Sequence, residues 1–129
     1  MKKWQATVFF LVILLCVVAF PTPSAHAWPQ SETSTVKVKA WNYNAFWASD
    51  THCELIYLKK TDGTRIYPNS RNGCSATFYN IPNNRYYTIV VYGYVYRQSS
   101  EFSRSSSAYV NRPPIGNTVW LDFYFFASP

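Results

Sequence analysis

The sequence is poor in the residues from which enzymes build reactive sites. Its 129 residues include two histidines, six acidic residues and three cysteines, and the acids are scattered along the chain. It contains no Gly-x-Ser-x-Gly motif, no glycine-rich phosphate loop and no zinc-binding pattern of histidine and cysteine. We therefore expect a protein that is not an enzyme, with no catalytic residues, no metal site and no cofactor.

Long apolar runs are also scarce, and the one present, residues 8–20, is shorter than the roughly 20 residues needed to span a membrane. Lys2 and Lys3 precede it, and Ala25-His26-Ala27 follows it with small residues at two alternate positions. This order is typical of a secretory signal peptide. We expect residues 1–27 to be cleaved and a bacterial-type secreted, extracellular protein to remain, without a transmembrane anchor.

Charge narrows the range of partners. Without Lys2 and Lys3 the remaining chain has a net charge of +4 and no run of basic residues. Nucleic acid is therefore not an expected partner. The positive charge suits wall polymers or lipid head groups, but it equally suits simple solubility.

Aromatic residues are abundant in the sequence, which contains 11 Tyr, 9 Phe and 5 Trp. Such residues favour strands, and no helical periodicity occurs after residue 27. After a loose leader over 28–35, we expect strands at 36–40, 53–59, 65–67, 75–81, 86–96, 108–110 and 119–126. The Asp62-Gly63 pair indicates a tight hairpin, 68–73 a turn, and the serine-rich stretch 98–107 a mobile loop. The pattern predicts one antiparallel β-sandwich of about seven strands over 36–129.

Two cysteines remain after the predicted cleavage, Cys53 and Cys74. A pair of cysteines in an exported domain predicts a disulfide bond. The pairing also argues against a Cys–His nucleophile at His52 and Cys53, because that chemistry needs a free thiolate.

Residues 72–94, NGCSATFYNIPNNRYYTIVVYGY, resemble a stretch of prealbumin-like sandwiches, which include carboxypeptidase regulatory-like and Cna B-type modules. The resemblance lies at Gly73, Phe78, Asn80, Ile81, Pro82, Tyr87, Ile89 and Val91. It implies a prealbumin- or immunoglobulin-like sandwich that acts as a stalk, spacer, adhesion or binding unit. Some Cna B-type modules also contain a Lys–Asn or Lys–Asp isopeptide bond, for which Lys37 or Lys39 and Asp122 are the matching positions. Because the strand over 86–96 contains no acid to assist, we expect the disulfide to serve instead.

Two strands place aromatic residues on both of their faces. If Tyr87, Ile89 and Val91 face the core, the outward set is Tyr86, Thr88, Val90, Tyr92, Tyr94 and Tyr96. The last strand divides in the same way into Val119, Leu121, Phe123 and Phe125 on one side and Trp120, Asp122, Tyr124 and Phe126 on the other. An exposed aromatic sheet marks a contact surface, for sugars or for another subunit, unless the leader and the loop over 41–50 cover it. That loop either binds a ligand or closes the end of the core.

The leading hypothesis is a secreted, non-catalytic module that binds an extracellular or cell-envelope polymer or glycan, polysaccharide among them. Its predicted binding residues are Trp41, Tyr43, Trp47, Tyr92, Tyr94, Trp120 and Tyr124. The alternatives are a self-associating or assembly subunit of an extracellular layer or fibre, and a small cationic effector such as an inhibitor or antibacterial protein.

Overall fold

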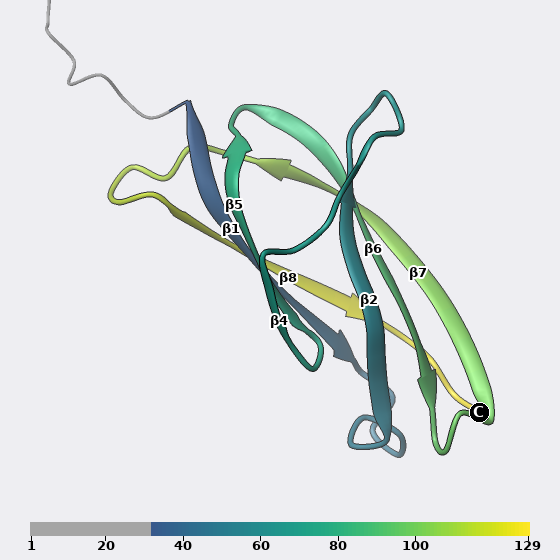
Figure 1. Cartoon of the computed structure of the whole chain (residues 1–129). Helices are drawn as coiled ribbons and strands as arrows, with labels where there is room; N and C mark the ends of the chain where they lie inside the picture. Colours follow the sequence, from purple (N-terminus) through teal and green to yellow (C-terminus); the bar gives the residue numbers. More distant parts are fainter. Residues whose placement is uncertain (1–31) are drawn as a thin grey trace, which may run out of the picture. The chain divides into compact units, whose positions relative to one another are not determined.

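The computed structural model describes residues 32–129, which form two β-sheets and no helix (Figure 1). The strands are β1 (Thr33–Asn42), β2 (Thr51–Lys59), β3 (Arg65–Ile66), β4 (Ser70–Asn72), β5 (Ser75–Pro82), β6 (Arg85–Val95), β7 (Ser100–Val110) and β8 (Thr118–Phe125). The predicted all-β class is therefore confirmed. Over the same residues, no helix long and apolar enough to cross a membrane is found. The predicted signal peptide and the leader up to residue 31 lie outside the described residues, and β1 begins before the strand expected at 36–40.

Each sheet has four strands, in the orders β4-β5-β1-β8 and β3-β2-β6-β7. All of them except the two-residue β3 are labelled in Figure 1. The prediction of a wholly antiparallel sandwich is wrong at one place, because β1 and β8 pair in parallel. A parallel pair requires a long crossover rather than a tight turn. Here the whole chain between β1 and β8 provides that crossover, and residue alternation alone does not encode the direction of such a pair.

The core lies between the sheets and consists of alternate residues of the long strands. Tyr87, Ile89 and Val91 face inward from β6 and are buried, as the alternation predicts. The Tyr87 hydroxyl donates a hydrogen bond to the Pro82 carbonyl at 2.7 Å, and burial raises the pKa of this phenol. The alternation places Val90 on the outer face, but it is buried opposite Tyr57, which is buried as well.

The prediction of a mobile loop over residues 98–107 is wrong. Nearly all of this stretch belongs to β7, which pairs with β6 without a break from Arg85↔Val110 to Val95↔Ser100. Serine has a low strand propensity, but the long β6 supplies backbone partners along its whole length, and tertiary pairing overrides propensity. A short strand, β4, likewise lies within the predicted turn at 68–73.

The predicted Asp62-Gly63 turn is confirmed between β2 and β3. Gly63 has a positive φ of 90°, and the Asp62 carboxylate accepts a hydrogen bond from the Thr64 N–H at 2.8 Å. This bond from the Thr64 backbone lowers the pKa of Asp62. The turn therefore has both the glycine and the side-chain acceptor that a tight hairpin needs.

A bulge in β2 decides which way Cys53 points. The register with β6 shifts between Cys53 and Leu55, which leaves Glu54 as an extra, exposed residue. Side chains alternate along a regular strand, so Cys53 and Ile56 would lie on opposite faces. With the bulge both are buried in the core.

Gly93 makes room for this bulge. It lies opposite Cys53, and a Cβ at this position would be 2.0 Å from the His52 carbonyl oxygen and 3.0 Å from the Cys53 Cα. Both neighbours are backbone atoms, which cannot move aside as a flexible side chain does. A residue with any side chain at 93 therefore conflicts with the bulge.

The inward-facing Cys53 forms the predicted disulfide with Cys74, which lies in the turn between β4 and β5. The bond therefore joins the two sheets. The Arg71 guanidinium on β4 reinforces the link by donating a hydrogen bond to the Cys53 carbonyl.

We predict that Gly93→Ala lowers the free energy of unfolding by about 3 kcal/mol, since the new methyl group overlaps backbone atoms. Urea denaturation of the oxidised protein measures this change. Gly116→Ala is the control, because Gly116 has a positive φ but a Cβ added to it would meet no other atom within 4 Å. Its expected cost is about 1 kcal/mol, and equal costs for the two variants would contradict the role given to Gly93.

We also predict that replacing both cysteines by alanine lowers the free energy of unfolding by about 3 kcal/mol, because the bond closes a loop with a sequence separation of 21. Thermal unfolding with and without reductant measures the effect. Reductant should destabilise the natural chain to a similar degree and leave the double variant unchanged. An unfolding midpoint that is insensitive to reductant in both proteins would disprove the bond's contribution.

Candidate functional site

The outward-facing side chains of β1 and β8 form a continuous surface on one side of the β4-β5-β1-β8 sheet. The strands pair in parallel and in register, so alternate residues of both point to the same side. The outward pairs are Lys37↔Trp120, Lys39↔Asp122 and Trp41↔Tyr124. Tyr43 and Phe126 extend the surface just beyond the two strands, with ring centroids 5.4 Å apart. We call this set the aromatic face: Lys37, Lys39, Trp41, Tyr43, Trp120, Asp122, Tyr124 and Phe126.

The rings of the aromatic face are open to solvent. Trp120 is 70% exposed, and Tyr124 and Tyr43 are each 64% exposed. These exposed fractions show that the loop after β1 leaves the rings uncovered, and the loop's own Phe46 is almost fully exposed as well. Large apolar side chains gathered on one exposed surface are unusual in a soluble domain and indicate a contact site.

Polar contacts hold these rings in place. The Lys39 ammonium lies 3.8 Å from the centroid of the Trp41 ring, and the Lys37 ammonium lies 4.8 Å from that of Trp120. The Trp41 indole N–H donates to the Asp122 carboxylate at 3.1 Å, and the Trp41 and Tyr124 rings are stacked with an interplanar angle of 13°. The arrangement is therefore an ordered platform of rings with charged groups between them.

The predicted binding residues fall into three groups. Trp41, Tyr43, Trp120 and Tyr124 lie together on the aromatic face. Tyr92 and Tyr94 lie on β6, in the other sheet. Trp47 is half-buried and packs against the core, and the centroid of its ring lies 5.6 Å from that of Tyr96.

Sequence reasoning did not include Lys37, Lys39 and Asp122 among the binding residues. It considered Lys37 and Lys39 only as positions for an isopeptide bond, which requires a buried amine. It considered Asp122 both for that bond and as an outward residue of the last strand. Lys39 and Asp122 are exposed and contact Trp41. The pairing of β1 with β8 places both lysines over aromatic rings, and no pattern within 36–40 indicates that pairing.

The tyrosines of β6 lie in a different chemical setting. The Tyr92 hydroxyl donates a hydrogen bond to the Glu101 carboxylate of β7, and this bond, followed by desolvation and nearby negative charge, raises the pKa of Tyr92. The Tyr94 ring stacks on His52 with centroids 4.9 Å apart. Tyr92 is thus bound to a neighbouring acid, whereas the rings of the aromatic face contact lysines and one another and are exposed at their edges and free faces.

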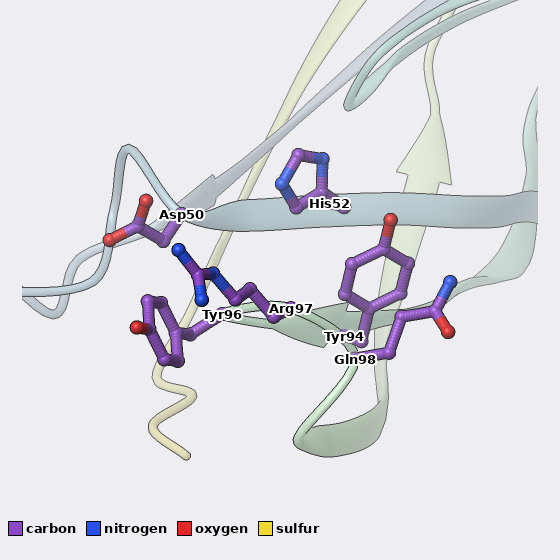
Figure 2. Close-up of a pocket in the computed structure, with 6 residues that line it drawn as sticks. All are labelled: Asp50, His52, Tyr94, Tyr96, Arg97 and Gln98. Atoms are coloured by element: carbon purple, nitrogen blue, oxygen red, sulfur yellow. The ribbon is translucent and has the colours of Figure 1, made fainter.

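A pocket of about 440 Å³ lies beside Tyr94, where β2 begins and β6 ends (Figure 2). Its lining residues are Asp50, His52, Tyr94, Tyr96, Arg97 and Gln98. Of these, sequence reasoning proposed only Tyr94 as a binding residue. Three successive residues at its rim, Tyr96 to Gln98, have positive φ angles of 48°, 48° and 63°. Residues other than glycine rarely adopt this backbone conformation, so no simple sequence signal marks the pocket.

Over residues 32–129 the structure shows neither a free thiol beside His52 nor a cluster of metal-ligating side chains. Cys53 is oxidised, which removes the thiol that a Cys–His pair would need. Over residues 32–129, no group of three or more His, Cys, Asp or Glu side chains is arranged to hold a metal ion.

Comparisons with protein-family models, with curated proteins and with solved structures gave no match. The resemblance of residues 72–94 to prealbumin-like modules therefore stays a prediction. The positions that carry it include Phe78, Ile81 and Tyr87, all buried in the core. A shared packing pattern of this kind bears on the fold and not on the ligand.

Proposed function

We propose that this chain is a secreted, non-catalytic module that binds an extracellular or cell-envelope polymer through the aromatic face, with polysaccharide as the leading class. The observation that carries the proposal is the parallel, in-register pairing of β1 and β8, which sets exposed rings in rows along one sheet. A polymer lying along the strands meets several rings in succession.

The chemistry of the aromatic face suits a carbohydrate chain. Flat rings of Trp and Tyr stack on the apolar faces of sugar rings, while the Asp122 carboxylate and the tyrosine hydroxyls lie beside them as hydrogen-bonding groups. The strand backbone and the Trp41–Asp122 hydrogen bond order these side chains before any ligand arrives. A preordered surface loses less conformational entropy on binding, which favours affinity.

Charge further defines the proposed ligand. The two lysines of the aromatic face outnumber its single acid, and the chain is basic overall. Acidic polysaccharides and phosphate-containing wall polymers are therefore favoured over neutral glycans. Such a contribution weakens as salt rises, because exposed charges are screened.

We predict that Tyr124→Ala weakens binding to a ligand polymer at least about tenfold, or ~1.4 kcal/mol, because a stacking surface is lost. A panel of acidic and neutral glycans and isolated wall polymers, followed by titration calorimetry on the best ligand, measures this change. Tyr86→Ala is the matched control, since Tyr86 is 61% exposed but lies on the other sheet.

Two further variants separate binding from folding. Trp120→Ala should resemble Tyr124→Ala, whereas Trp47→Ala should lower the unfolding temperature because Trp47 packs against the core. The proposal fails if the folded natural chain binds no member of the panel. It also fails if Tyr86→Ala weakens binding as much as Tyr124→Ala does.

A further inference from the structure

β7 is a long open edge of the β3-β2-β6-β7 sheet. It has 11 residues, and its backbone ladder is made with β6 on one side only. An unpaired edge offers a row of N–H and C=O groups to another strand. Proteins block such edges with short strands, proline, charged side chains (lysine above all) or bulges. The 11 residues of β7 contain no proline and no lysine, their charged residues are Glu101 and Arg104, and their register with β6 is unbroken.

The other edges are less open. β3 has two residues and β4 has three, so neither supports a long ladder. The residues that follow β8 contact the first half of β7 through side chains: Arg104 donates to the Phe126 carbonyl at 3.1 Å, and the Ser100 hydroxyl donates to the Ser128 carbonyl at 3.1 Å. These bonds use side chains of β7 and not its backbone groups. Large rings also protrude from β8. The serine-rich edge of β7 is therefore the best suited to pairing.

We propose that β7 pairs antiparallel with β7 of a second copy of this chain, about a two-fold axis at Ser105. Ser105 is the middle residue of the strand, so this register uses β7 from end to end. It places Ser103 opposite Ser107 and Glu101 opposite Tyr109. Arg104 lies opposite Ser106, and no two like charges face each other across the strands. A register centred on Arg104 would instead set two arginines opposite each other, which is unfavourable.

Side-chain size also suits this partner. On the outer side, Ser103, Ser105 and Ser107 are small and exposed, so two strands can approach without steric conflict. Serine hydroxyls both donate and accept hydrogen bonds, which allows identical residues to pair across a two-fold axis. The same strand therefore offers a surface that is complementary to itself.

The dimer has a geometric consequence for the aromatic face. Antiparallel edge pairing extends the β3-β2-β6-β7 sheet into one of eight strands, with corresponding faces on the same side. The two aromatic faces then point in the same direction, and one polymer can contact both. This gain in avidity rests on the proposed function, but the dimer itself does not.

Charge substitutions at the two-fold axis test the pairing. Ser105→Lys and Ser105→Glu each place like charges opposite each other, so each should raise the dimer dissociation constant at least about tenfold. Mixing the two variants in equal amounts should restore the dimer, since opposite charges then meet. Sedimentation velocity over a concentration series measures all three samples, and circular dichroism checks that each variant is folded.

Asn72→Lys on the short edge strand β4 is the control for added charge, and it should dimerise like the natural chain. A natural chain that remains monomeric at its highest soluble concentration would overturn the proposal. The same holds if Ser105→Lys dimerises normally, or if the mixed variants stay monomeric. Polymer binding is measured separately on the monomeric variants, so loss of the dimer and loss of the proposed function are distinguishable.

Discussion

The missing side chain of Gly93 is the constraint on which the rest of this structure depends. It lets the His52 carbonyl approach β6, which permits the bulge at Glu54, and the bulge turns Cys53 toward the core. Only from there does Cys53 meet Cys74 and join the two sheets. A domain of this size has a small core, so a covalent link of about 3 kcal/mol is a large part of a stability that is typically about 5–15 kcal/mol.

The link also determines what the outer surfaces are able to do. The core and the disulfide lie between the two sheets, so the outer sides of β1 and β8 are not part of the contact that holds the sheets together. Rings such as Trp120 therefore remain exposed without loss of the fold. The parallel pairing of β1 and β8 fixes which side chain of one strand lies beside which side chain of the other. Core and surface are thus separate, and variants of the aromatic face can report on binding without unfolding the protein.

Much of the fold could be predicted from local patterns, and the rest depended on long-range pairing. Alternation identified the inward face of β6, the cysteine count identified the disulfide, and Asp62-Gly63 identified the hairpin. Strand propensity did not predict β7, because its serines form a strand only through their pairing with the long strand β6. The parallel β1–β8 pair and the bulge join residues far apart in the sequence, and no local pattern encodes them. For the same reason four predicted binding residues converge on one face, while Tyr92, Tyr94 and Trp47 lie elsewhere.

The lysines decide what kind of polymer the aromatic face selects under the proposed function. In the unbound protein Lys37 and Lys39 lie over ring faces, so a neutral sugar meets an ammonium group where it would stack. A cation–π contact at an exposed site contributes only about 0.5–1 kcal/mol. A hydrogen bond to a charged group contributes about 1.5–3 kcal/mol. A carboxylate or phosphate on the polymer therefore draws the ammonium away from the ring and leaves the ring free to stack. Under the proposed function, negative charge on the ligand therefore frees the Trp41 and Trp120 ring faces for stacking, while Tyr43 and Tyr124 have no lysine over them in this structure.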